Sequence, residues 1–329
     1  MASTFDDEYR ALHGDAIWTD RSTRDARLEV RGPDAATWLQ GLLTQDVASL
    51  QAGQGAYAAY LTPQGRMIAD LRVFHRGEAF VLECASTVRA SLLSRLDQFV
   101  IMEDVTVVDL TEALGCLTVV GPTSAASASA CTGIALSTLN GLPEHASLPL
   151  AVPGAFVAAS REFGVPAFDL YAPRQDLAIW RTLLQARVPQ AGERTLETAR
   201  IEAGRPRFGV DMDGDTIPLE AGIESRAISF DKGCYVGQEV VIRILHRGQG
   251  RVARRLVWVE HAPHAQDSSG WHPGEAVYLG QKAVGNVSSV CWSPARGGLL
   301  GIAMVHRDAF EPGTTVRIGA HEAVVRALP

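Results

Sequence analysis

The spacing of apolar residues changes period several times in the first third of the chain. Ala35 to Leu43 has the spacing of a helix, whereas Gly55 to Leu61 alternates like a strand. The turn-forming residues 62–65 separate this strand from a second one, Arg66 to His75. Phe80 to Glu83 indicates a third strand. The pattern therefore predicts a three-stranded meander preceded by a helix.

This meander places Tyr57 and Asp70 on neighbouring strands. After it, Ala90 to Phe99 carries apolar residues at the spacing of an amphipathic helix, and Val105 to Asp109 resumes a strand pattern. These elements predict a first unit of mixed α and β structure that closes near residue 110.

A second pattern begins at Gly115 and predicts a smaller α+β domain. Beyond Arg251 the chain consists of short alternating segments between Gly and Pro turns, which is typical of a small β-barrel or sandwich. The second pattern contains the strands Leu117 to Val120 and Phe168 to Tyr171 and the helix Leu177 to Ala186. A further helix, Glu193 to Ala203, follows it. The later segments are Arg255 to Val259, Ala276 to Leu279, Leu299 to Val305 and Thr315 to Ile318.

Composition narrows the class of protein. A chain of 329 residues with 47% apolar and 20% charged residues is expected to fold into two or three packed units. The net charge of −7 argues against nucleic acid as the main partner. No apolar run is long enough for a membrane helix, and the first ten residues are acidic where a targeting peptide is basic. We therefore expect a cytoplasmic protein that does not associate with a membrane.

Cysteine spacing excludes the familiar metal motifs. The five cysteines lie far apart, without a CxxC pair or a Cys/His cluster at zinc spacing, and we predict no metal site. His261 and His264 form an HxxH, but they lie in a polar loop and are interpreted as solvated side chains.

The most unusual segment is the octapeptide KGCYVGQE, which precedes an apolar run, Val240 to Ile242, that indicates a helix. Cys234 lies ahead of this helix and two residues from Lys232, so the helix dipole and a positive charge both favour its thiolate. Lys232 is one of only two lysines in a chain that otherwise uses arginine, which suggests that the ammonium itself is required. The alternative is that Cys234 is a small buried apolar residue, as most free cysteines are.

KGCYVGQE resembles the KGCYxGQE signature of the YgfZ family, which belongs to the aminomethyltransferase (GcvT) superfamily. Its residues are Lys232, Gly233, Cys234, Tyr235, Gly237, Gln238 and Glu239. Other segments agree: residues 42–47 (LLTQDV) resemble an early helix motif of the superfamily, Tyr57 with Leu61 and Gly65 resembles its YxxxL-turn-glycine segment, and residues 201–206 resemble its EAG-x-P element. Residues 218–220 (PLE) precede the signature as in YgfZ proteins.

The resemblance implies a GcvT-like multidomain α+β fold, with two α+β domains that contain ferredoxin-like elements and a small C-terminal β-barrel. The first α+β part would cover residues 1–112, the middle domain 113–190, a return segment that completes the folate-binding domain 191–250, and the barrel 251–329. In this arrangement the returning chain brings Glu202 and Cys234 to Tyr57 and Asp70.

The resemblance also implies a pocket for tetrahydrofolate or a one-carbon derivative. A carboxylate at the end of a helix, Glu202, suits the adjacent amino group and ring N–H of a pterin, although a solvated helix residue is an open alternative. Tyr57 and Tyr235 are expected to line the ring, and Asp70 to act on the one-carbon unit. Arg243, together with the nearby Arg247 and Arg251, is a candidate for the folate glutamate tail, with a solvated basic face as the alternative.

Two departures from the glycine-cleavage aminomethyltransferase leave the activity open. That enzyme has adjacent aspartates where this chain has Ala69 and Asp70, and KGDFIG followed by a base where this chain has Cys234 and Gln238. The first hypothesis is folate-dependent assembly or repair of iron–sulfur proteins, including cluster enzymes that modify tRNA, in which Cys234 and Lys232 supply the chemistry and the partners are client proteins or assembly factors. The second is one-carbon transfer at Asp70, and the third is a non-catalytic binding adaptor.

Overall fold

The computed structural model describes residues 4–246, 250–261 and 270–329, and its chain divides into two compact units. Unit 1 comprises Met1–Leu61, Ile68–Thr195 and Arg226–Val236. Unit 2 comprises Thr62–Met67, Leu196–Ser225 and Gly237–Pro329. Among the described residues, no helix is long and apolar enough to cross a membrane.

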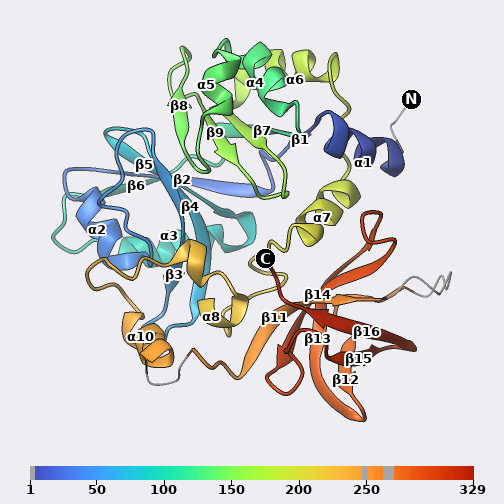
Figure 1. The fold of residues 1–329 in the computed structure, drawn as a ribbon. Helices are drawn as coiled ribbons and strands as arrows, with labels where there is room; N and C mark the ends of the chain where they lie inside the picture. Colours follow the sequence, from blue (N-terminus) through green and yellow to red (C-terminus); the bar gives the residue numbers. More distant parts are fainter. Residues whose placement is uncertain (1–3, 247–249, 262–269) are drawn as a thin grey trace. The chain divides into compact units, whose positions relative to one another are not determined.

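Unit 1 contains two five-stranded sheets (Figure 1). The first has the order β3-β4-β5-β2-β6, and the second has the order β1-β7-β10-β9-β8. The strands of the first are β2 (Asp25–Arg31), β3 (Gly55–Leu61), β4 (Met67–His75), β5 (Ala79–Ala85) and β6 (Thr106–Asp109); those of the second are β1 (Ile17–Asp20), β7 (Leu114–Val120), β8 (Ser147–Pro149), β9 (Phe156–Ser160) and β10 (Ala167–Pro173).

Helices cover the outer face of each sheet. α2 (Ala35–Leu42) and α3 (Arg89–Gln98) bury Leu39 and Leu92 against the first sheet. The second sheet packs its apolar face on three helices: α4 (Ser124–Thr132), α5 (Leu136–Asn140) and α6 (Leu177–Gln185). Since side chains alternate along a strand, every second residue of each strand belongs to these cores.

The other faces of the two sheets meet inside unit 1. Phe74 of β4 contacts Phe156 and Tyr171 of the second sheet, with ring centroids 5.6 and 5.7 Å apart. Beside these rings, Arg72 pairs with Glu83 at 2.9 Å and with Asp169 at 2.7 Å. Buried charges of this kind are stable only when they are paired, so this face combines apolar packing with an ion network.

Unit 2 contains a closed six-stranded barrel of order β11-β14-β13-β12-β15-β16 (Figure 1). Its core holds Val257, Val287 and Ala303, and most strands contribute residues at alternate positions. The strands are β11 (Arg254–Glu260), β12 (Ala276–Leu279), β13 (Lys282–Ser293), β14 (Gly298–His306), β15 (Thr315–Ile318) and β16 (His321–Arg326). The expected combination of α+β parts with a C-terminal β-barrel is confirmed.

Short helices complete the chain. α7 (Glu193–Glu202) leads into unit 2, where α8 (Pro218–Ala221) and α10 (Gln238–His246) lie; α9 (Glu224–Ala227) spans the change of unit, and α1 (Phe5–Gly14) precedes the first strand. β1 pairs with β7, so a strand from the predicted first part joins the sheet of the predicted middle domain. The four-part division stays a prediction.

Candidate functional site

Tyr57 and Asp70 lie on the neighbouring strands β3 and β4, as the meander predicted. The Tyr57 hydroxyl donates a 2.8 Å hydrogen bond to Asp70 Oδ2. Ala69, one residue earlier on β4, is fully buried in the apolar core against α2 and α3. Because neighbouring residues of a strand point to opposite faces, the carboxylate that this chain keeps is on the face away from that core.

Burial dominates the electrostatics of Asp70. Loss of hydration raises its pKa to about 6, and the negative charge of Glu162 acts in the same direction. The hydrogen bond from Tyr57 and the positive charge of Arg226 oppose this rise. A carboxyl group with a pKa near 6 changes protonation state close to neutral pH, which suits a group that exchanges protons with a substrate.

Arg226 is a residue of this site that the sequence reasoning missed. Its guanidinium carbon lies 4.9 Å from the centroid of the Tyr57 ring. The side chain of Gln45 donates to the Arg226 carbonyl at 3.0 Å, which fixes the backbone of this short helix against the segment after α2. A single arginine in the four-residue helix α9 belongs to no sequence motif, so that only the folded structure reveals its position beside Tyr57.

Lys232 is anchored to backbone rather than to a side chain. Its ammonium donates to the carbonyl oxygens of Gln40, Leu43 and Gln45 at 2.7, 2.6 and 2.8 Å. These groups belong to the last turn of α2 and the residues after it, where helix carbonyls lack partners. An ammonium has three protons, and all three are used in these bonds. Burial lowers the pKa of Lys232 to about 8.

This geometry adds a structural role for Lys232 to the one expected from the sequence. With its three donors directed at carbonyl oxygens, the ammonium has none left for a hydrogen bond to the Cys234 sulfur. Lys232 instead fixes the loop that carries Cys234 to the end of α2. The expected effect of its charge on the thiolate stays a prediction. The LLTQDV motif also differs from a helix motif, because only Leu42 of its residues lies within α2.

Cys234 is exposed, whereas Cys84 and Cys116 are buried and the remaining two cysteines are partly buried. Burial raises the pKa of Cys131 to about 11 and that of Cys291 to about 12. The interpretation of Cys234 as a small buried residue is therefore wrong. Its thiol is the most accessible of the five.

The residues of the octapeptide that follow Cys234 hold the cysteine loop in position. Tyr235 is buried, which raises its pKa to about 12, and its ring lies 5.2 Å from the Lys232 ammonium. The backbone of Val236 donates to Gly41 at 3.1 Å. Gly237 has a φ of 85°, a conformation that only glycine adopts easily, and Gln238 and Glu239 begin α10. Tyr235 thus packs within the loop, and its expected contact with the folate ring stays a prediction.

Glu202 and Arg243 belong to unit 2. Glu202 is the last residue of α7 and accepts a hydrogen bond from the buried Ser293 of β13. Arg243 is exposed on α10. Arg247 lies outside the described residues. The prediction that Glu202 joins Tyr57, Asp70 and Cys234 stays a prediction.

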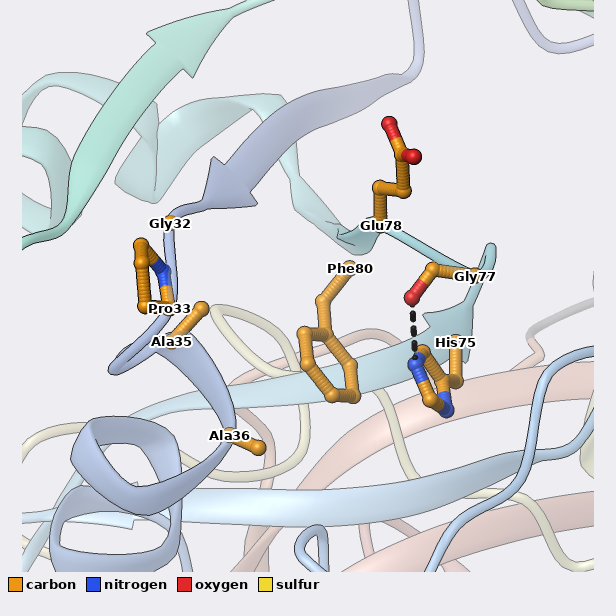
Figure 2. Close-up of a pocket in the computed structure, with 8 residues that line it drawn as sticks. All are labelled: Gly32, Pro33, Ala35, Ala36, His75, Gly77, Glu78 and Phe80. Carbon is orange, nitrogen blue, oxygen red and sulfur yellow. Dashed lines mark hydrogen bonds between the residues drawn. The ribbon is translucent and has the colours of Figure 1, made fainter.

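A cavity of about 440 Å³ is lined by His75, the last residue of β4, and by Phe80 of β5, among others (Figure 2). The His75 ring stacks on Phe80 with centroids 4.4 Å apart, and both of its nitrogens lie within 2.9 Å of carbonyl oxygens, those of Leu50 and Gly77. Glu78 supplies the one carboxylate among its lining residues. None of the predicted site residues lines this cavity.

Comparison with known proteins assigns the family. Residues 1–232 match the GCVT N-terminal domain, and residues 254–328 match the glycine cleavage T-protein C-terminal barrel domain. An aminomethyltransferase from Rubrobacter xylanophilus is 30% identical over 302 residues, which cover 91% of this chain and 78% of that protein. One from Rippkaea orientalis is 29% identical and covers 96% and 85%. The chain therefore belongs to the glycine cleavage T-protein family, and it is aminomethyltransferase-like.

A solved structure agrees with this assignment at the level of the fold. The glycine cleavage system aminomethyltransferase T from Bartonella henselae matches with a TM-score of 0.87 and 22% identity, over 98% of this chain and 88% of that chain. The GcvT-like fold expected from the motifs is confirmed. Membership of the narrower YgfZ branch rests on the sequence motifs, which are the octapeptide, the PLE segment at 218–220 and the departures from the transferase, and it stays a prediction.

Proposed function

We propose that this protein binds tetrahydrofolate or a one-carbon derivative and takes part in folate-dependent one-carbon transfer. The observation that carries the proposal is the Tyr57–Asp70 pair, in which a carboxyl group with a pKa of about 6 accepts a hydrogen bond from a phenol. The names of the similar aminomethyltransferases support it.

The side chains fit such a ligand chemically. Glu202 offers carboxylate oxygens at a helix end, and one of them is oriented by the buried Ser293. Paired donors on a pterin ring suit a carboxylate. Tyr57 offers an aromatic face, and the exposed guanidinium of Arg243 suits a carboxylate tail. When bound, folate supplies the carrier nitrogen atoms for the one-carbon unit.

Asp70 then has two tasks that its surroundings allow. Above its pKa it accepts a hydrogen bond or a proton from an amine on the substrate, and the Tyr57 hydroxyl holds Oδ2 in place while it does so. Its position beside buried sheet residues limits access of water, which strengthens these interactions.

The decisive test is tetrahydrofolate binding by the wild type, Glu202→Ala and Arg174→Ala under anaerobic, reducing conditions. Arg174 is a matched charged residue of unit 1 that pairs with Glu112. We expect binding by the wild type and the control and loss of at least tenfold in affinity with Glu202→Ala. Failure of the wild type to bind contradicts the proposal, and the binding adaptor then becomes the better hypothesis.

A second candidate function is favoured by the exposed Cys234. In the YgfZ-type hypothesis, this cytoplasmic protein supports assembly or repair of iron–sulfur proteins, with the thiol as a nucleophile or transient ligand and with cluster proteins as partners. The loop geometry supports it, since Lys232 and Val236 fix the chain on both sides of an exposed sulfur.

Two variants separate these functions. In a transfer assay that follows formation of methylenetetrahydrofolate from an aminomethylated carrier, one-carbon transfer predicts that Asp70→Asn is inactive and Cys234→Ala is active. The iron–sulfur hypothesis predicts no transfer by any form, together with loss of cluster-enzyme activity in cells that carry Cys234→Ala. A fully active Cys234→Ala strain would remove the second function.

A further inference from the structure

Arg226 lies over an aromatic ring, as Arg76 of the same unit does over Phe156 at 4.3 Å. Its guanidinium lies 4.9 Å from the Tyr57 ring centroid, and within the described ranges it forms no salt bridge. By contrast, Arg21, Arg72 and Arg89 each pair with a carboxylate within 3.0 Å. The Arg226 cation is directed at an aromatic face, which carries the negative end of the ring quadrupole.

The backbone around Arg226 is held in place by the residues after α2. Gln45 donates to the carbonyl of Arg226 at 3.0 Å, and the buried Thr44 hydroxyl donates to the carbonyl of Ala227 at 2.6 Å. The amide of Ser229 donates to the Thr44 carbonyl at 3.0 Å. Three hydrogen bonds therefore join residues 44–45 to residues 226–229, which lie about 180 residues later in the sequence. They preorganise the Arg226 guanidinium over the Tyr57 ring.

The charged groups that act on Asp70 come from several elements. Tyr57 of β3 donates to it, Arg226 supplies positive charge, and Glu162, between β9 and β10, supplies negative charge. The Cys84 thiol on β5 also interacts with Asp70. Arg226 thus supplies positive charge that acts on Asp70, and it lies over the ring of Tyr57, the residue that donates a hydrogen bond to Asp70.

We propose that Arg226 is a positioning residue that acts through Tyr57, holding the ring so that its hydroxyl stays directed at Asp70 and keeping that carboxyl group ionised. A cation over a phenol ring draws electron density from the hydroxyl and makes it a stronger hydrogen-bond donor. The inference rests on the proposed role of Asp70 in one-carbon transfer, and it adds Arg226 as the residue that favours the ionised form of Asp70. Arg226 itself donates no hydrogen bond to Asp70 in this arrangement.

The test is the titration of Asp70 followed by carboxyl carbon NMR, with Asp70→Asn used to assign the signal. In Arg226→Gln we expect the titration midpoint to rise by about half a pH unit or more, because a nearby positive charge is lost. Arg226→Lys should restore most of the shift. The control is Arg317→Gln, which removes an equivalent contact with Tyr278 at 4.6 Å in the barrel and should leave the midpoint unchanged.

A double-mutant cycle tests the route through Tyr57. If Arg226 acts through the phenol, Arg226→Gln shifts the midpoint less in a Tyr57→Phe background than in the wild type. An unchanged midpoint in Arg226→Gln overturns the inference, and an equal shift in both backgrounds overturns the route through Tyr57. The titration requires no folate, so a wild type that fails to bind tetrahydrofolate refutes the proposed function while the midpoint shift still reports on Arg226.

Discussion

The carbonyl oxygen of Leu43 accepts a 2.6 Å hydrogen bond from the ammonium of Lys232, 189 residues later in the chain. With the bonds to Gln40 and Gln45, this contact closes the end of α2 with a side chain from the cysteine loop. Lys232, which the sequence suggested as a partner of the Cys234 thiol, therefore caps the C-terminal end of α2.

Replacement of Lys232 by Met should accordingly lower stability. Three carbonyl groups lose a charged donor at once, and we expect a cost of about 2 to 4 kcal/mol in the free energy of unfolding. The measurement is chemical denaturation. Lys282→Met is the matched control, since the only other lysine forms an exposed pair with Asp308 and its loss should cost less than about 1 kcal/mol. Equal effects would contradict the capping role.

Asp70→Asn should stabilise the protein at alkaline pH. Folding raises the pKa of Asp70 from 3.8 to about 6. Between pH 4 and pH 6, about the two pKa values, the folded state therefore keeps a proton that the unfolded state has released. The contribution of Asp70 to stability falls as the pH rises through this range. The ionised group is a cost above pH 6 that asparagine removes. Allowing for partial solvent access, we expect about 1 to 2 kcal/mol at pH 8 and little at pH 4.

The midpoint of urea-induced unfolding at both pH values measures this effect. Asp46→Asn serves as a control in which the effect should have the opposite sign, because the pKa of Asp46 is lowered in the folded protein. Burial raises that pKa, but hydrogen bonds from Gln40 and Ser49 and the charge of Lys232 outweigh the effect of burial. That variant should lose stability at pH 8, and the loss should fade as pH drops below the usual range of aspartate. A stabilising effect of Asp70→Asn that does not depend on pH would refute the explanation.

Cys234 should react with iodoacetamide well before the other thiols. It is exposed, while burial raises the pKa of each of the other four cysteines. Mass spectrometry after a short exposure at pH 7.5 should find modification at Cys234 at least tenfold above that at Cys131. Comparable labelling of the two sites would indicate that the loop is closed in solution and would favour the adaptor hypothesis.

Gly65→Ala should disturb the turn between β3 and β4. Gly65 has a φ of 74°, and an added Cβ would lie 2.9 Å from Val240 Cβ. Gly77→Ala is the control, because Gly77 also has positive φ, 91°, but has open space around it. Both variants carry backbone strain of about 1 kcal/mol, and the additional loss of melting temperature in Gly65→Ala reports the contact with α10.

Local pattern predicted much of the fold. β3, β12 and β15 have the bounds expected from the sequence, because alternation and turn residues mark them clearly. β1 and β13 were not predicted. β1 is four residues long and pairs with β7, about a hundred residues away, so that its partner cannot be inferred from local spacing.

The candidate site was predicted in part. The meander predicted the adjacency of Tyr57 and Asp70, since both elements are local. Arg226 and the anchoring of Lys232 to backbone carbonyls were missed, because each depends on contacts with residues 40–45, which lie far away in sequence. A side chain that binds backbone carbonyls leaves no signature in the pattern of its own neighbours.

The alternation of Ala69 and Asp70 on β4 has an evolutionary consequence. A strand that shifts by one residue exchanges its two faces. One insertion or deletion in the turn at 62–65 that moved β4 past β3 would turn the carboxylate of Asp70 into the apolar core and present a methyl group beside Tyr57. The length of a four-residue turn therefore decides on which face of β4 the aspartate stands.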